Sequence, residues 1–201
     1  MRFLPLLALL PLAARAEVVD FEGMPIGSPP MDWTIVKTGG GGDPRWEVVA
    51  DSTSPAGARV LAQRSEDATS ERFLLAIHPA AALANGAVTV RFKPVSGNVD
   101  RAAGLVWRYR DESNYYVVRA NALEDNVVLY KVEGGQRTAL APAGKGGEHA
   151  VGYSVPAERW STLRVAFMGP RFVVSVDSKP MFEVEDSTFA GPGKVGLWTK
   201  A

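Results

Sequence analysis

Short apolar segments in which every second residue is hydrophobic recur along this chain at intervals of about 10 to 15 residues, separated by Gly, Pro, Asn and Asp. This alternation is typical of β-strands, and no segment keeps the helical period over the length of a stable helix. The sequence therefore predicts an all-β protein, a two-sheet antiparallel sandwich formed by a single domain over residues 17–201. The predicted strands cover residues 17–21, 33–37, 45–49, 59–63, 72–77, 87–92, 104–110, 115–121, 127–132, 137–141, 161–168, 171–176, 181–185 and 194–198.

The central strands predict two faces of one sheet. A four-residue loop at 111–114 pairs Arg110 with Tyr115, and a second loop at 122–125 continues the sheet. This register assigns an apolar core face to Leu105, Trp107, Tyr109, Tyr116, Val118 and Ala120. It assigns an outer face to Val106, Arg108, Arg110, Tyr115, Val117, Arg119, Asn121, Asn126, Val128 and Tyr130.

Two further hairpins are predicted in the second half of the chain. A two-residue turn at Gly169 and Pro170 places Phe167 opposite Phe172 and suits a type II′ geometry. A five-residue loop after Val176 puts residues 182 and 184 in the core, with Glu183 and Glu185 pointing outward.

The first 16 residues have the composition of a secretory signal peptide. A positive charge at Arg2 precedes an apolar run, and small residues at Ala14 and Ala16 predict cleavage before Glu17. The chain has no cysteine, which favours bacterial export to the periplasm or the extracellular space. No later segment is long and apolar enough for membrane insertion.

Charge and composition exclude some partners. Loss of Arg2 and Arg15 with the leader leaves 20 basic against 22 acidic residues, without a run of like charge. We therefore expect no binding to nucleic acid or to anionic membranes, and we expect a monomer.

Four segments carry a family resemblance: GLVWRYRDESNYYVVRANALEDNVVLYKV, RWSTLRV, RFVVSVDSKPMFEVED and GPGKVGLWTKA. Over roughly Ala87 to Ala201 the chain resembles the concanavalin A-like lectin/glucanase superfamily, and within it exported bacterial laminin-G-like domains related to the 3-keto-disaccharide hydrolase family. The resemblance implies a two-sheet jelly roll with a curved outer face that often binds sugar, and it does not by itself imply catalysis.

Catalytic motifs do not support an enzyme. The glucanase pattern Glu-x-Asp-x-x-Glu has one near match starting at Glu183, where Glu185 replaces the aspartate and Thr188 replaces the second glutamate. The two histidines, His78 and His149, belong to no nucleophile or zinc motif, and without cysteine a closed zinc site is not expected. We predict no catalytic residues.

A calcium site is a weaker expectation. Asp20 and Glu22 lie on one face of the first predicted strand and offer the oxygen ligands that calcium prefers. In resembling domains a further ligand comes from a last strand beside the first. Because similar sequences continue beyond the equivalent of Ala201, we expect that the chain is C-terminally incomplete and leaves an unpaired strand edge.

The outer face carries the candidate binding site. Its residues offer guanidinium groups, amide groups and aromatic rings on one surface. Guanidinium and amide groups suit sugar hydroxyls, and aromatic rings suit the C–H faces of sugars. Its predicted ligand residues are Arg108, Tyr115, Arg119, Asn121, Asn126 and Tyr130. The structural alternative is that the arginine stems only cover apolar sheet surface. Three functions stay open: an exported glycan-binding module, an enzyme acting on 3-keto-disaccharides, and a structural envelope domain without a small ligand.

Overall fold

The computed structural model describes residues 16–80 and 82–200, and within these residues the regular secondary structure consists of β-strands. The predicted leader lies almost entirely outside the described residues. Over the part of the chain that is described, no helix is long and apolar enough to cross a membrane. The strands are β1 (Thr34–Gly39), β2 (Trp46–Ala50), β3 (Arg59–Gln63), β4 (Arg72–Ile77), β5 (Gly86–Phe92), β6 (Ala102–Asp111), β7 (Asn114–Asn121), β8 (Asn126–Glu133), β9 (Gln136–Ala139), β10 (Ala150–Gly152), β11 (Ser161–Met168), β12 (Arg171–Val176), β13 (Lys179–Glu185) and β14 (Lys194–Lys200).

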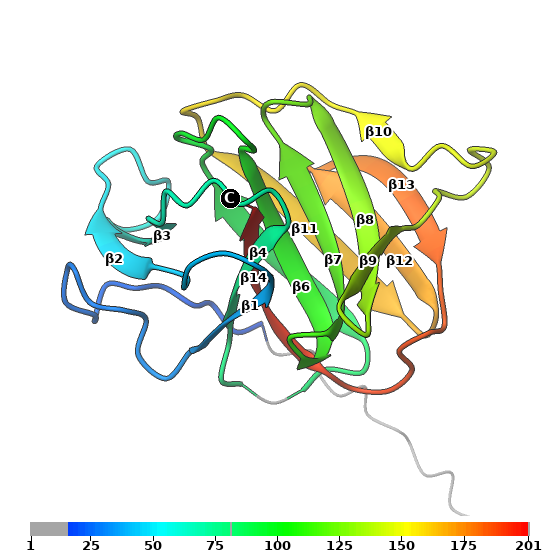
Figure 1. Ribbon diagram of the computed structural model, residues 1–201, viewed down its shortest axis with the longest axis horizontal. Coiled ribbons are helices and arrows are strands. Elements are labelled where there is room, and N and C mark those ends of the chain that lie inside the picture. The colour runs from blue at the N-terminus through cyan, green and yellow to red at the C-terminus, as the bar shows by residue number, and fades with distance from the viewer. Residues whose placement is uncertain (1–15, 81, 201) are drawn as a thin grey trace, which may run out of the picture.

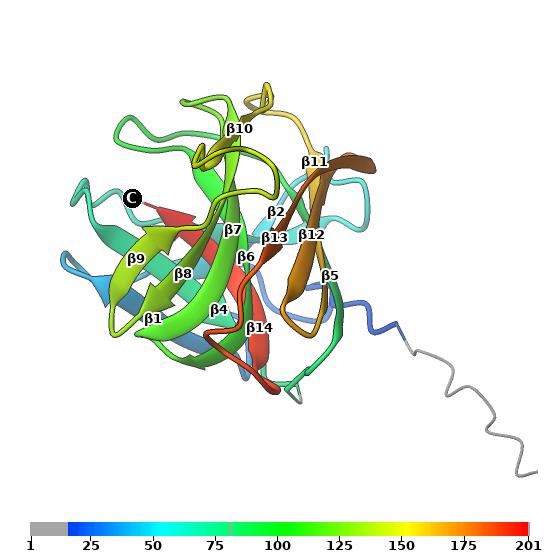
Figure 2. The same ribbon diagram turned by 90° about the vertical axis from the view of Figure 1, so that its right-hand side faces the viewer.

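The strands form two facing antiparallel sheets and a separate hairpin (Figure 1). The large sheet has the order β1-β4-β14-β6-β7-β8-β10, with β9 also paired to β8. The small sheet has the order β13-β12-β11-β5, and β2 pairs with β3 alone. Figure 2 views the sandwich edge-on, with the small sheet facing the curved large sheet. The predicted two-sheet sandwich is confirmed.

The main core lies between the two sheets. Trp107 from the large sheet stacks on Tyr116 at a centroid distance of 5.5 Å and meets Phe172 of the small sheet edge-on at 5.3 Å. Leu105, Val118, Leu163 and Val165 are also fully buried in this cluster. The core face predicted for these residues by alternation is therefore confirmed. Replacing a buried tryptophan such as Trp107 by alanine lowers the free energy of unfolding by about 3–5 kcal/mol, so this face contributes strongly to stability.

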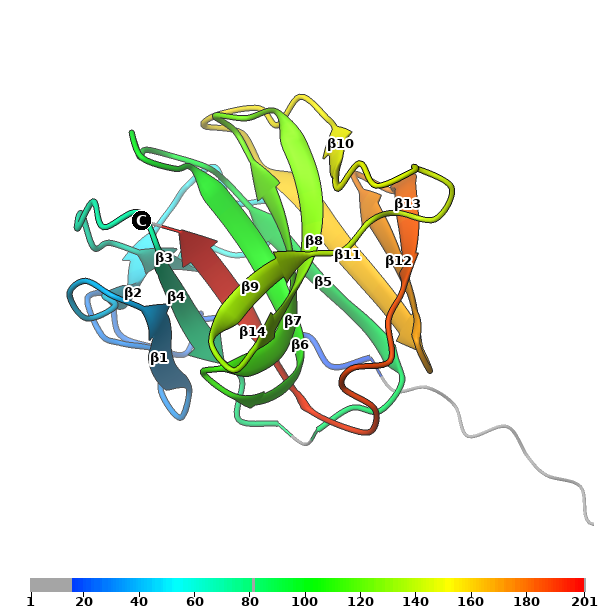
Figure 3. The ribbon, with the colours of Figure 1, turned by 45° about the vertical axis from the view of Figure 1, so that its right-hand side comes forward.

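A second core fills the other face of the large sheet. The sheet curls so strongly that opposite corners approach each other, with β8 and β9 rising in front of β14 (Figure 3). The Tyr115 hydroxyl lies 2.8 Å from Thr38 Oγ1 on the far edge strand, and the Arg137 guanidinium lies 4.3 Å from the Phe73 ring centroid. The cluster inside this curl contains Phe73, Leu75, Ile77, Ala102, Val106, Tyr115, Val117, Val132 and Trp198. We call this side of the large sheet the curled face.

The β6–β7 hairpin departs from the predicted register. Trp107 pairs with Tyr116, and the next pair is Asp111 with Asn114, so a bulge interrupts β6 between Trp107 and Asp111. The Asp111–Asn114 pair keeps the predicted register at the end of the hairpin, but the predicted pair of Arg110 with Tyr115 is not formed, and beyond the bulge the register has shifted. Trp107 and Tyr116 nevertheless lie on the core face, as predicted. The reason is that a register shift of two residues leaves every side chain on the same face of the sheet.

The bulge exchanges the faces of two β6 residues. Arg108 has a left-handed backbone with φ +49°, and its guanidinium lies 5.4 Å from the Phe172 ring, on the side of the main core. Tyr109 instead packs against the cluster of the curled face. Both predicted positions are wrong because strict alternation ends at a β-bulge.

The later hairpins follow the predictions more closely. The turn at Gly169 and Pro170 pairs Phe167 with Phe172, and Gly169 has φ +54° as a type II′ turn requires. After Val176 the loop contains two residues, not five, and a bulge between residues 174 and 175 restores the parity of the next strand. Val184 is consequently buried in the main core, as predicted.

The ends of the described chain differ from expectation. Residues 17–21, predicted as the first strand, form no strand. The last strand, β14, lies between β4 and β6 and is paired on both sides.

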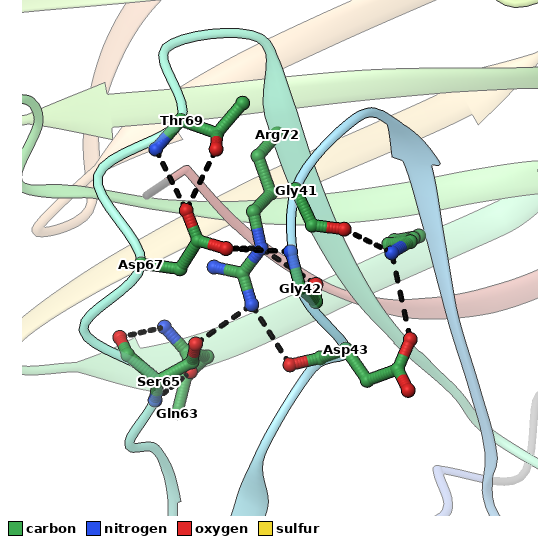
Figure 4. Close-up of polar contacts among 9 residues, drawn as sticks. Gly41, Gly42, Asp43, Gln63, Ser65, Asp67, Thr69 and Arg72 are labelled. Carbon is green, nitrogen blue, oxygen red and sulfur yellow. Dashed lines mark hydrogen bonds and ion pairs between the residues drawn. The ribbon is translucent and has the colours of Figure 1, made fainter.

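The Gly-rich loop at 37–44 is held by a buried arginine (Figure 4). Arg72 of β4, with no exposed surface, donates hydrogen bonds to the Gly42 carbonyl at 2.8 Å, the Asp43 carbonyl at 2.8 Å and Ser65 Oγ at 2.7 Å. Asp67 accepts from the Gly42 amide on the same loop. These contacts fix the loop against β4, so its glycines follow a defined path.

Candidate functional site

A group of polar side chains lies at the end of the curled face where β7 leads into β8. We call it the polar rim, and it consists of Asp100, Arg119, Glu124, Asn126, Tyr130 and Lys200. Arg119 and Asn126 share the curled face because Arg119 pairs with Val128 and Asn121 pairs with Asn126 across the predicted hairpin. Glu124 comes from the turn between the two strands, which brings its carboxylate over Arg119.

Arg119 organises the polar rim. Its guanidinium donates to Asn126 Oδ1, to Glu124 Oε2 at 2.6 Å and to the Tyr130 hydroxyl at 3.2 Å. The arginine is only 5% exposed, whereas the Glu124 side chain keeps 47% of its surface open to solvent. Arg119 therefore holds these side chains from the buried side, and of the three, Glu124 is exposed while Asn126 and Tyr130 are half-buried.

The charges at the polar rim are balanced. Partial burial raises the pKa of Glu124, but the Arg119 guanidinium and hydrogen bonds from Arg119 and Asn126 outweigh it, so the pKa of Glu124 lies below its ordinary value. Lys200 forms an ion pair with Asp100 at 2.7 Å, and this aspartate is 3% exposed. Glu124 is thus an ionised acceptor at neutral pH, next to cations that fix its position.

Aromatic rings flank this cluster. Arg137 of β9 lies between the Phe73 ring at 4.3 Å and the Tyr130 ring at 4.5 Å, as a cation over two aromatic faces. Tyr130 also receives Arg119 at 5.9 Å from its centroid. The Tyr130 ring is consequently held by guanidinium groups from two strands.

The structure brings together three of the six predicted ligand residues. Arg119, Asn126 and Tyr130 form the polar rim, as described above. Tyr115 is fully buried in the curl and Asn121 is 1% exposed, so neither presents surface for a ligand. Arg108 lies on the opposite face of the sheet. The open platform expected on this face is therefore smaller than predicted, because the curl closes over its apolar half.

Sequence reasoning missed Glu124, Arg137 and the ion pair of Lys200 with Asp100. Glu124 lies in a turn and Arg137 at an edge strand, where alternation carries little information about partners. The signal available for Glu124 was its place in a tight hairpin loop next to Arg119.

The two predicted calcium residues, Asp20 and Glu22, both accept hydrogen bonds from backbone amides in the described chain. Glu22 Oε1 accepts hydrogen bonds at 2.7 Å from the amides of Ala58 and Arg59, and Asp20 Oδ1 accepts from the Glu22 amide at 3.2 Å. No group of three or more metal-ligating side chains occurs within residues 16–80 and 82–200. Glu22 instead tethers the N-terminal segment to β3.

The carboxylates and histidines weighed for catalysis lie apart from the polar rim. Glu183 forms an exposed ion pair with Arg171 on the outer face of the small sheet, as its predicted outward orientation implies. His78 meets the Trp33 ring edge-on at 5.0 Å, and His149 is exposed in the loop before β10.

Two cavities lie elsewhere on the surface. One of about 380 Å³ borders edge strand β1 and is lined by Lys37, Asp43, Pro44 and Glu112 among others. Another of about 300 Å³ lies at the end of the sandwich opposite the polar rim and contains Arg108.

Comparison with solved structures identifies the fold. The carbohydrate-binding module CBM66 from Bacillus subtilis superposes with a TM-score of 0.62 at 20% sequence identity, covering 84% of this chain and 88% of that chain. The fold is the concanavalin A-like jelly-roll sandwich. A Bacillus subtilis protein of unknown function with a galectin-like fold gives a TM-score of 0.53 at 13% identity, covering 85% of this chain and 83% of that chain. No family model matches this chain, and no curated protein matches it either.

The jelly-roll fold that the resemblance implied is confirmed. At these identities the likeness extends to the fold alone. The narrower resemblance to 3-keto-disaccharide hydrolases stays a prediction.

Proposed function

We propose that this protein is a carbohydrate-binding module that holds a neutral glycan at the polar rim of the curled face. The observation that carries the proposal is the buried Arg119, which fixes the partly exposed Glu124 and the half-buried Asn126 and Tyr130 in one arrangement. A preorganised set of this kind loses little conformational entropy on binding.

The chemistry of the polar rim suits sugar hydroxyls. Glu124 offers carboxylate oxygens that accept hydrogen bonds, and the Asn126 amide offers both a donor and an acceptor. The Tyr130 hydroxyl, which accepts a hydrogen bond from Arg119, adds a donor beside them, while Arg119 and Arg137 lie over the ring. Because Glu124 is paired with Arg119 and Asp100 with Lys200, the charges of this site are balanced, which suits a neutral sugar.

The fold is consistent with this function. The solved module CBM66, described as carbohydrate-binding, covers most of this chain in superposition. We also propose that the leader-like residues 1–16 direct export to the bacterial periplasm or beyond, where polysaccharides are accessible. N-terminal sequencing of the exported protein is expected to begin at Glu17.

The test is affinity electrophoresis through gels that contain neutral polysaccharides such as levan, inulin, laminarin or mixed-linkage β-glucan. We expect retardation by at least one polymer, and at least about tenfold weaker binding for Glu124→Gln and for Asn126→Ala. The matched control is Glu183→Gln, which removes the charge of another arginine-paired glutamate on the outer face of the small sheet. Its binding is expected to be unchanged.

Arg119→Ala is a poor test of binding because the arginine is buried and holds three other side chains. Loss of retention in that variant would not separate binding from folding. The proposal is wrong if no neutral polysaccharide retards the natural protein, or if both polar-rim variants bind like Glu183→Gln.

An enzymatic function on 3-keto-disaccharides stays a prediction from the resemblance. It is tested separately by incubating the purified protein with a 3-keto-glucoside and following release of the sugar.

A further inference from the structure

The cavity at the far end of the sandwich has unusual charge chemistry. Its volume is about 300 Å³, and Arg108 is the one charged residue among the described residues that line it. The other lining residues are small or uncharged: Ala84, Asn85, Gly169, Pro170, Ser187, Ala190 and Gly191. In Figure 1 the segment between β13 and β14 crosses this lower end, while the β7–β8 turn of the polar rim lies at the top. We call this cavity the Arg108 pocket.

The β6 bulge places Arg108 there. Its left-handed backbone, at φ +49°, is uncommon for a residue other than glycine and turns the side chain from the curled face to the end of the sandwich. Gly193 of the neighbouring segment packs directly on this backbone, since a Cβ added to Gly193 would lie 2.4 Å from the Arg108 Cα. The chain thus accommodates a strained residue whose side chain enters the pocket wall.

Three backbone carbonyls hold the guanidinium. Arg108 donates to the Phe189 carbonyl at 2.8 Å, to the Ala84 carbonyl at 3.3 Å and to the Gly169 carbonyl. The Nε–H group is buried and has no hydrogen-bond partner within the described residues. The hydrogen bonds that the Arg108 guanidinium does form therefore all go to uncharged backbone carbonyls, which come from three separate loops.

The positive charge of Arg108 is not compensated by a carboxylate. The arginine is 3% exposed, and in the described part of the chain it takes part in no ion pair. Buried charges in proteins are normally paired, because an unpaired charge in a low-dielectric site is costly. The two other buried arginines of this chain, Arg72 and Arg119, each have an acidic partner.

A second cation strengthens the positive potential. Arg110 lies over the Phe189 ring at 5.0 Å and donates to the Ala190 carbonyl at 3.0 Å, on the same loop that lines the pocket. Burial also lowers the pKa of Arg108, which reflects the cost of keeping it charged without an anion nearby.

We propose that the Arg108 pocket binds a small organic carboxylate, a uronic or aldonic acid of monosaccharide size. The carboxylate would supply the negative charge that Arg108 lacks, through a charge-assisted hydrogen bond. Asn85 and Ser187 offer polar atoms for hydroxyls, and Pro170 and Ala190 offer apolar surface for the sugar ring. The volume lies at the small end of the range for ligand sites, which fits one sugar unit.

This site is independent of the glycan site at the polar rim. The carboxylates of the polar rim are paired with Arg119 and Lys200, so its charges are balanced, whereas the Arg108 pocket is lined by an arginine and, among the described residues, by no carboxylate. The two sites therefore select sugars of different charge, and either one can fail in experiment without the other.

The test uses D-galacturonate and D-glucuronate, with D-galactose, D-glucose, inorganic phosphate and chloride as comparison ligands, in calorimetric and amide-NMR titrations. We expect at least one uronate to bind in the millimolar range or tighter, with shifts of the Gly169 and Gly191 amides, and its neutral parent to bind at least about tenfold more weakly.

Ser187 supplies matched variants because its side chain is exposed in the pocket wall. Ser187→Asp adds a carboxylate beside Arg108 and is expected to weaken uronate binding at least about tenfold, whereas the neutral Ser187→Asn stays within about threefold. Neither variant should alter polysaccharide retention at the polar rim.

The proposal is overturned if neither uronate binds at about 50 mM, if galactose or glucose binds as tightly, or if phosphate and chloride bind as tightly as the uronates. It is also overturned if Ser187→Asp and Ser187→Asn have the same effect. Substitution of Arg108 itself is avoided, since it holds three loops together.

Discussion

Replacing Arg72 by methionine removes a charged side chain that has no exposed surface. The arginine donates three hydrogen bonds, of 2.8, 2.8 and 2.7 Å, to the Gly42 carbonyl, the Asp43 carbonyl and Ser65 Oγ. Its Nε also lies 3.9 Å from Asp67 Oδ2. Methionine occupies a similar volume but makes none of these contacts.

The magnitude follows from these contacts. Each hydrogen bond from a charged donor contributes about 1.5–3 kcal/mol, and rehydration of the loop carbonyls offsets part of the loss. Breaking one partner of a buried charged network costs about 3–5 kcal/mol in comparable cases, which we expect for Arg72→Met. For a chain of this length that is a decrease in Tm of roughly 6–20 °C.

The assay is urea and thermal unfolding followed by near-ultraviolet circular dichroism. Arg171→Met is the matched control, because Arg171 also lies on a strand and pairs with a carboxylate, that of Glu183, but its side chain is 59% exposed. We expect that control to lose less than about 1 kcal/mol. If Arg72→Met is as stable as Arg171→Met, the assignment of Arg72 as the anchor of the Gly-rich loop is wrong.

Three further outcomes are expected. Tyr115→Phe removes the hydroxyl that meets Thr38 across the curl and should lower the free energy of unfolding by about 1 kcal/mol in urea titrations; no change would mean that this contact does not close the curl. The pKa of Asp51 is lowered from 3.8 to about 2, and the largest cause is a hydrogen bond from Lys93. Because the pKa is lower in the folded protein than in the unfolded chain, ionised Asp51 stabilises the fold fully above pH 4, and this contribution is lost as the pH falls towards 2. Fluorescence of the nearby Trp160 should change in that window, and Asp51→Asn should remove this transition; an identical acid transition in the variant would contradict the assignment. Gly196→Ala places a Cβ 2.6 Å from a β4 carbonyl and should cost roughly 1–3 kcal/mol by thermal unfolding, so an unchanged Tm would refute the close approach of the two strands.

Local patterns determined much of the fold. The turn at Gly169 and Pro170 was predictable because its residue types suit one turn geometry, and the pairing of Phe167 with Phe172 follows from it. The core position of Trp107 was predictable for a similar reason: side chains two residues apart on a regular strand share a face. The alternation of side chains between the two faces of a strand was enough to predict the fold class.

Bulges lie beyond such reasoning. Nothing in the residues around Arg108 indicates a left-handed backbone, since the same alternation suits an uninterrupted strand. Contacts with Gly193 and with carbonyls from three loops offset the strain of the backbone at φ +49°. These partners are far from Arg108 in the sequence, so a local pattern gives no sign of them. The prediction for Arg108 was therefore wrong, although that for its neighbour Trp107 was right.

The candidate site was only half determined by the sequence. The hairpin register brought Arg119 and Asn126 together, because their spacing across a short turn is a local property. The burial of Tyr115, by contrast, depends on Thr38 from the far edge of the sheet. Parity assigns a side chain to a face, but whether that face stays open depends on the twist accumulated over the whole sheet, and only the tertiary structure decides it.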